Sequence, residues 1–234
     1  MNQNLFKDLE IGAIVTDDFR TSKVFTAVGI DFCCGGKQSV GEACQELKID
    51  ITELEQNVDK VKSEPINQSL NFKEWELPFL IDYIVNTHHK YVTKALPELV
   101  FYTAKIAEVH GENHAELIDI ATKIAAVNTE LSQHLKNEEE VLFPAIKSIL
   151  AKPTEETKTV IVSEITRMLD EHDFAGGTLD EINRITDGYK THDDACNTYQ
   201  VAFKLLEQFE DDINVHVHLE NNILFPKALK LAEN

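Results

Sequence analysis

The stretch His134-Leu-Lys-Asn-Glu138-Glu-Glu-Val-Leu142-Phe143-Pro144 has a near copy at His216-Val-His-Leu-Glu220-Asn-Asn-Ile-Leu224-Phe225-Pro226. In both copies a His is followed four residues later by a Glu and then, at the same offset, by Leu-Phe-Pro. Residues four apart share one face of an α-helix, so each copy places an imidazole beside a carboxylate. Each Pro follows its Glu by six residues, where a helix tends to kink or end.

Both His–Glu pairs lie on an apolar seam of their predicted helix. In the helix predicted over about 114–149, alternating steps of three and four pass through Leu117, Ile120, Ile124, Val127, Leu131, His134, Glu138, Val141 and Ala145. The last predicted helix gives Ala195, Tyr199, Ala202, Leu206, Phe209, Ile213, His216, Glu220 and Ile223. Such a seam faces the core of a helix bundle. An ionised carboxylate there is costly unless it is paired, protonated or bound to metal, so the pattern indicates a site.

Two further histidines lie on apolar seams of their own. His89 leads into Val92, Leu96 and Leu99, and His172 lies on a seam with Leu169 and Ala175. The spacing from His89 to His134 is 45 residues and that from His172 to His216 is 44. The chain therefore contains two similar halves, each a helix with one His followed by a helix with His-x-x-x-Glu.

The spacing of these four histidines also predicts their height in the fold. Residues at one level of consecutive antiparallel helices lie about equally far from the connecting turn. The three successive midpoints fall at Gly111, Pro153 and Asp194, each within a segment typical of a turn. We therefore expect an all-α fold whose main part is an up-down four-helix bundle with four His and two Glu at one level.

Six such donors suit iron, manganese or zinc. Two carboxylates can each bridge a pair of metal ions, leaving two His for each ion, whereas one structural zinc ion needs only four ligands. We predict a two-metal site, with iron as the first choice and with the ligands His89, His134, Glu138, His172, His216 and Glu220. The other five histidines are left out, three because they lie near turns about 30 Å away along a helix and two because they are off the seam: His110, His114 and His192, then His88 and His218.

Residues 1–62 predict a small all-helical domain, joined to a bundle over 77–234 by a linker at 63–76. Residues 1–17 form a lead-in with Asp17-Asp18 as a candidate cap, and the glycines of 29–37 exclude a regular helix there. The patterns Ser39-x-x-Glu42 and Thr52-x-x-Glu55 predict capping boxes that open helices 40–48 and 53–61.

Composition excludes several classes of protein. A formal charge of −19 argues against nucleic acid as a partner, since phosphates require a basic surface. The polar N-terminus shows no secretory signal and no apolar run has membrane-spanning length, so we expect a cytoplasmic protein that does not bind membranes. Four Cys in 234 residues make no disulfide framework, and Cys44 and Cys196 fall within helical patterns and are read as structural.

The two His-x-x-x-Glu…Leu-Phe-Pro segments, with His89 and Glu-His172-Asp-x-Ala-Gly, resemble a hemerythrin-like di-iron bundle. Gly-Ile-Asp-Phe-Cys33-Cys34-Gly-Gly-Lys resembles the N-terminal domain of the RIC/ScdA-type family of iron–sulfur cluster repair proteins. Together they resemble that family across nearly the whole chain. The resemblance implies two non-haem iron ions, carboxylate- and oxo-bridged, with Glu138 and Glu220 as bridges. It also implies repair of iron–sulfur proteins damaged by nitric oxide or peroxide, with Cys33 and Cys34 assisting the reaction.

Three functions stay open at this point. The first is cluster repair by iron donation or by handling of nitric oxide. The second is an enzyme that reduces nitric oxide to nitrous oxide. The third is a sensor that binds oxygen or nitric oxide, with the N-terminal unit as an adaptor. The sequence also leaves open whether the chain forms a homodimer.

Overall fold

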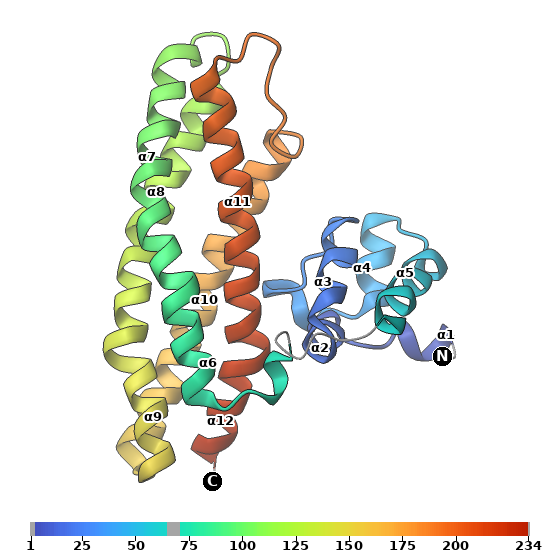
Figure 1. The fold of residues 1–234 in the computed structure, drawn as a ribbon, viewed down its shortest axis with the longest axis vertical. Helices are drawn as coiled ribbons and strands as arrows, with labels where there is room; N and C mark the ends of the chain where they lie inside the picture. Colours follow the sequence, from blue (N-terminus) through green and yellow to red (C-terminus); the bar gives the residue numbers. More distant parts are fainter. Residues whose placement is uncertain (1–2, 65–70, 234) are drawn as a thin grey trace.

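The computed structural model describes residues 3–64 and 71–233, and the chain forms a long helical bundle with a small helical unit at its side (Figure 1). Helices account for nearly all the regular structure in these residues, which confirms the all-α fold class. The first long helix comprises α6 (Leu77–Ile84), a π-helical turn η5 (Val85–His89) and α7 (Lys90–His110). The second comprises α8 (Glu116–Asn137), the π-turn η6 (Glu138–Leu142) and α9 (Phe143–Ala151).

The third long helix is α10 (Glu155–Ile185), which a capping box of Thr154 and Thr157 opens. The fourth comprises α11 (Asn197–Leu219), the π-turn η7 (Glu220–Leu224) and α12 (Phe225–Glu233). All three connections fall where the midpoints between the histidines predicted them. Consecutive long helices run antiparallel, so the predicted up-down bundle is confirmed (Figure 1).

The π-turns change the register of the predicted seam. A π-turn adds one residue to a turn of helix, so the buried face moves on by one position after Glu138. Leu142 is fully buried, whereas Val141, which the seam placed in the core, is exposed. Nor does Pro144 end its helix: it stands at the second position of α9, directly after the wider turn, where a missing N–H is tolerated.

The bundle core consists of two apolar clusters. One lies toward the α7–α8 turn and includes Val92, Ile124 and Leu206, and the other lies toward α9 and α12 and includes Leu80 and Ile146. The histidines and glutamates of the predicted site lie between the two clusters. The core of this bundle is therefore interrupted by one ionisable layer.

The N-terminal unit contains α1 (Gln3–Phe6), α2 (Ile11–Asp17), η1 (Phe19–Thr21), α3 (Ser22–Thr26), η2 (Cys34–Lys37), α4 (Val40–Leu47) and α5 (Ile51–Ser63). The predicted lead-in therefore contains two short helices, α1 and α2. Asp18 caps η1, and the Ser39–Glu42 capping box is present. The second predicted capping box is wrong: Asp50 accepts from the amides of Thr52 and Glu53. An Asp just before the first helical turn satisfies those amides, so the helix begins two residues earlier than predicted.

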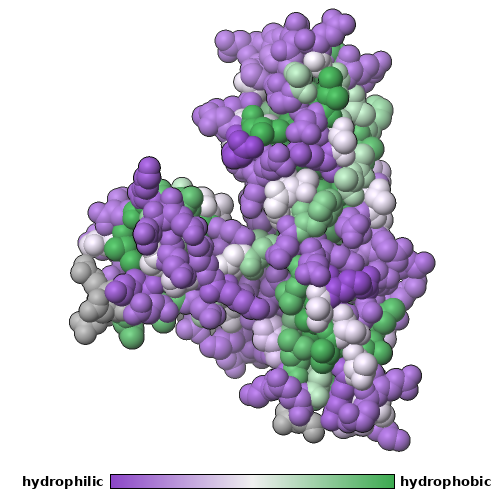
Figure 2. All heavy atoms as spheres, turned by 180° about the vertical axis from the view of Figure 1, so that it is seen from behind, coloured by the Kyte–Doolittle hydropathy of each residue, from purple (hydrophilic) through white to green (hydrophobic). Residues whose placement is uncertain are grey.

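Part of the predicted linker, residues 65–70, lies outside the described residues, and η4 (Phe72–Glu74) precedes α6. The N-terminal unit packs against the bundle and shares an apolar cluster with it through Phe25, Phe32 and Cys33. From behind, hydrophilic residues cover most of the surface (Figure 2). Within the part of the chain that the structure describes, no helix has the length and apolar character needed to cross a membrane.

Candidate metal centre

The six predicted ligands meet in one buried layer of the bundle. Their donor atoms form two groups of four in which each residue contributes one ligand atom: His89, Glu138, His216 and Glu220 in one group, and His134, Glu138, His172 and Glu220 in the other. Both carboxylates belong to both groups. Each of the six residues is at most 1% exposed. The structure thus contains two adjacent four-donor groups that share both carboxylates.

The distances between the donor atoms fit metal coordination better than hydrogen bonding. Glu138 Oε2 lies 3.3 Å from His134 Nε2 and 3.4 Å from His89 Nε2. Glu220 Oε1 lies 3.1 Å from His216 Nε2, and its Oε2 lies 3.2 Å from His172 Nε2. None of the four carboxylate oxygens has a hydrogen-bond partner. Metal–ligand bonds of about 2.0–2.2 Å imply spacings of roughly 3.0–3.5 Å between neighbouring ligand atoms, so the donors fit a cation.

Electrostatics also favour a cation in this layer. Burial and the nearby Glu220 raise the pKa of Glu138, but His134 and His89 outweigh them and the pKa is lowered. The pKa of Glu220 is likewise well below its usual value, because His216, His172 and His89 outweigh burial. Both carboxylates are therefore ionised at 0% exposure, where anions require a positive partner. That partner is either the protonated imidazoles around them or a metal ion in place of those protons.

A ring of outer residues fixes three of the four imidazoles. Glu139 Oε1 lies 2.8 Å from His89 Nδ1, Glu171 Oε2 lies 2.7 Å from His134 Nδ1, and Asn221 Oδ1 lies 2.8 Å from His172 Nδ1. These acceptors require a proton on Nδ1, which leaves the Nε2 lone pair directed into the layer. None of these three residues was predicted from the sequence. Glu139 and Asn221 each directly follow a predicted bridging Glu, and that repeated offset was the available signal.

The Phe of each Leu-Phe-Pro motif packs against one of these imidazoles, on the side of the layer toward α9 and α12. The ring of Phe143 stacks on that of His89 with centroids 5.6 Å apart, and Phe225 stacks on His172 at 5.8 Å. Each Phe thus covers the His of the other helix of its own half. The π-turn before each Phe begins at Glu138 in one half and at Glu220 in the other. The wider turn therefore sets how far the carboxylate lies from the Phe ring along the helix.

The two halves differ in how the histidine of their second helix is held. Glu171, directly before His172, bonds to His134, and its counterpart directly before His89 is His88. His88 does not bond to His216 but stacks on it, with ring planes 8° apart and centroids at 5.6 Å. His88 itself pairs with Asp212 at 3.0 Å. As a result Nδ1 of His216 has no hydrogen-bond partner, and burial lowers the pKa of this imidazole despite Glu220.

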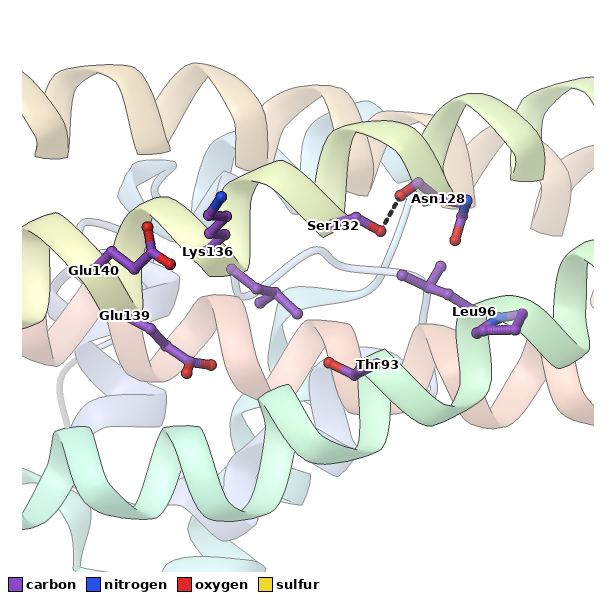
Figure 3. Close-up of a pocket in the computed structure, with 9 residues that line it drawn as sticks. Thr93, Leu96, Asn128, Ser132, Lys136, Glu139 and Glu140 are labelled. Carbon is purple, nitrogen blue, oxygen red and sulfur yellow. Dashed lines mark hydrogen bonds between the residues drawn. The ribbon is translucent and has the colours of Figure 1, made fainter.

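A groove between α7 and α8 leads to the edge of the layer (Figure 3). Its volume is about 440 Å³, and Thr93, Asn128, Ser132, Lys136 and Glu139 are among the residues that line it. Figure 3 shows Glu139 extending from the second long helix toward the first. Glu139 also bonds to His89, so only the Glu139 side chain separates solvent in the groove from this predicted ligand.

Cys33 and Cys34 lie beside the layer rather than in it. Cys34 Sγ is 3.5 Å from the carbonyl oxygen of His172, and it approaches Gly176, where an added Cβ would lie 3.0 Å from the sulfur. The loop is further held by Asn222, whose Nδ2 donates to the carbonyls of Phe32 and Cys33. Cys33 is buried, and its hydrogen bond with Cys34, its burial and the nearby Asp31 raise its pKa well above the usual value. The absence of a side chain at Gly176 allows this close approach.

The histidines that the sequence left out are also absent from the two donor groups. His218 is fully buried beside Phe32, and burial lowers its pKa to about 4. One cysteine differs from its interpretation: Cys196 is exposed and precedes α11 instead of lying within it. Its sulfur lies 3.2 Å from His110 Nε2, and that contact lowers its pKa to about 7.

Comparison with known families agrees with both parts of the structure. Residues 80–228 match the hemerythrin HHE cation binding domain. Residues 7–62 match ScdA_N, described as a domain of unknown function (DUF542). An iron–sulfur cluster repair protein YtfE from Yersinia pestis (strain Pestoides F) is 33% identical over 225 residues, which cover 96% of this chain and 98% of the relative.

The protein of that name from Yersinia pseudotuberculosis serotype O:1b (strain IP 31758) shows the same identity and coverage. The match to the cation binding domain covers all six residues of the ionisable layer, whose two donor groups could each hold a metal ion. The chain therefore belongs to the family of iron–sulfur cluster repair proteins that join an ScdA_N domain to a hemerythrin HHE cation binding domain.

Proposed function

We propose that this protein is a non-haem di-iron protein that repairs iron–sulfur clusters damaged by nitrosative or oxidative stress. The names of its relatives from Yersinia support cluster repair, and damaged iron–sulfur proteins are then its targets. The observation that carries the di-iron assignment is the sharing of Glu138 and Glu220 by both donor groups. One ion would be held by His89 and His216 and the other by His134 and His172.

The pair of irons would supply Lewis acidity and two electrons at adjacent positions. Around it, Glu139, Glu171 and Asn221 keep three imidazoles in the tautomer whose Nε2 is free to bind. Phe143 and Phe225 exclude water from the side of α9 and α12. Each group offers four protein donors, fewer than the six of an octahedral ion, which leaves room for a small ligand and for release of iron.

The groove between α7 and α8 supports access by nitric oxide or oxygen. It runs from Asn128 to Glu139, whose side chain is 45% exposed while its carboxylate bonds to His89. A diatomic molecule needs far less space than the groove provides. Movement of the Glu139 side chain would therefore open the layer on the His89 side without any change in the backbone.

The cysteines occupy the opposite side of the layer. We assign Cys33 and Cys34 an assisting role in the repair reaction, in which Cys34 is the thiol nearer the ligands through its contact with the carbonyl of His172. Asp31 receives hydrogen bonds from the amide and the thiol of Cys33. Together these three residues form another group of donors within reach of one ion, which supports the passage of iron through this loop.

The test is a repair assay. A hydratase that depends on a [4Fe–4S] cluster is inactivated with nitric oxide, and the recovery of its activity is followed after addition of the iron-loaded protein. We expect Glu138→Ala to lower both bound iron and the rate of recovery by at least about tenfold, because one bridge is lost. Glu156→Ala, an exposed carboxylate at the start of α10, serves as the matched control. Full recovery with the iron-free Glu138→Ala variant would refute the proposal.

Reduction of nitric oxide to nitrous oxide is the second candidate, since two irons side by side would bring two substrate molecules together. Two nitric oxide molecules, two electrons and two protons give one nitrous oxide and one water. Gas analysis after a single turnover of the reduced protein separates the two functions. Stoichiometric nitrous oxide favours the reductase, and its absence with intact repair excludes it.

A further inference from the structure

A second group of metal-binding side chains lies at the other end of the bundle. His114 belongs to the turn between α7 and α8, Glu116 is the first residue of α8, and His192 belongs to the loop between α10 and α11. Both connections lie at the same end of the bundle (Figure 1). One ligand atom from each of the three residues lies within 4.8 Å of the others. Neither the proposed function nor the fold requires these residues to meet.

The geometry converges on the Glu116 carboxylate. Its Oε1 lies 3.0 Å from His192 Nε2 and 3.6 Å from His114 Nδ1. Ligand atoms about 2.0–2.2 Å from a tetrahedral zinc ion are separated by roughly 3.3–3.6 Å. The contact with His114 fits this range, and the contact with His192, which is a hydrogen bond in this structure, needs to lengthen by a few tenths of an ångström. Two His and one Glu with an open fourth position are a ligand set that zinc adopts in proteins.

An outer carboxylate prepares His114 for this role. Asp194 lies 3.0 and 3.1 Å from His114 Nε2 through its two oxygens. This pairing places the proton on Nε2 and directs the Nδ1 lone pair toward Glu116, the arrangement of carboxylate, histidine and metal seen at metal sites. Glu171 and His134 show the same construction in the central layer.

The two imidazoles are packed against each other. Their ring centroids are 4.0 Å apart with planes at 20°, and the side chain of His114 is only 15% exposed. Such a stack suits two neutral rings that share one cation better than two rings that each carry a charge. The side chain of His192 is half exposed, so the site is open to ions from solution.

We propose that His114, Glu116 and His192 form a second metal site, which binds one divalent first-row transition-metal ion such as zinc and ties the α7–α8 turn to the α10–α11 loop. The proposal is independent of the repair function. The α7–α8 turn and the α10–α11 loop are far apart in the sequence. One ion bound to both would therefore cross-link them and stabilise this end of the bundle.

The test uses the full chain with iron in its central layer. Zinc is titrated into the iron-loaded protein by calorimetry, and the iron content is measured before and after. We expect one zinc per chain to bind with all iron retained. His114→Ala and His192→Ala should each weaken that binding by at least about tenfold, and Asp194→Asn by about 10- to 100-fold as an outer partner. Asp193→Asn and Glu112→Gln are exposed neighbours in the same two connections and should bind zinc as the unaltered protein does.

Several results would overturn the proposal. One is zinc that displaces iron from the central layer in proportion to its binding. Another is equal zinc affinity in the His114→Ala and His192→Ala variants. A third is loss of binding in Cys196→Ser with retention in His192→Ala, which would assign the zinc to the exposed thiol beside His110.

Discussion

The outer carboxylate Glu171 offers the most specific test of the central layer. Its Oε2 lies 2.7 Å from His134 Nδ1, and its side chain is only 14% exposed, so the contact is largely shielded from water. Loss of an outer partner of this kind weakens metal binding by about 10- to 100-fold, or ~1.4–2.7 kcal/mol. Because His134 belongs to one donor group only, the loss should affect the ion shared with His172 more than the other ion.

The assay is competition for ferrous iron with a chelator of known affinity. We expect Glu171→Gln to weaken one of two bound irons about tenfold and Glu171→Ala to approach 100-fold. Glu164→Gln is the matched control, since Arg167 pairs with both carboxylates but Glu164 does not contact His134. Iron affinities within twofold of the unaltered protein in both Glu171 variants would refute the reasoning. An equal loss in Glu164→Gln would refute it as well.

Three further predictions concern stability. Burial raises the pKa of Glu210 to about 7 from 4.5, so the folded chain keeps a proton that the unfolded chain has released, and stability falls as the pH rises between these values; Glu210→Gln should remove this fall in a series of thermal melts. Asn222→Ala deletes two hydrogen bonds to the carbonyls of Phe32 and Cys33, worth about 1–2 kcal/mol in total, and should speed hydrogen exchange at residues 33–37 without changing the bound iron. Leu131→Ala, in the core next to the layer, should lower the free energy of unfolding by about 2–5 kcal/mol in urea titrations, whereas Val141→Ala, on the exposed side of η6, should change it little.

The layer could be predicted from the sequence because its ionisable residues occupy positions where the helical pattern calls for apolar ones. Histidine and glutamate on an otherwise apolar seam can be recognised without a structure, and the spacing of His89, His134, His172 and His216 sets their common height. The residues that hold the imidazoles in place carry no such signal. Glu139 and Glu171 are charged residues among many in an acidic chain, and only the folded bundle shows that they face Nδ1 atoms of neighbouring helices.

Local rules failed where another contact competed with them. Thr52 and Glu55 have the spacing of a capping box, but Asp50 accepts from the amides of Thr52 and Glu53, so the helix begins two residues earlier, and Glu55 is buried. Val141 follows the ideal helical period, which the π-turn beginning at Glu138 breaks. Cys196 lies within a helical pattern, yet the contact with His110 across the end of the bundle is a tertiary one. The docking of Cys33 and Cys34 on α10 also depends on tertiary packing.

We propose that one buried layer holds two iron ions bridged by Glu138 and Glu220. Metal analysis combined with Mössbauer spectra of protein made in iron-replete cells tests it most directly. We predict two irons per chain, with distinct environments because His216 lacks the outer partner that His134 has, and loss of both in a Glu138→Ala, Glu220→Ala double variant. A single iron, or one zinc in place of iron, would contradict the account.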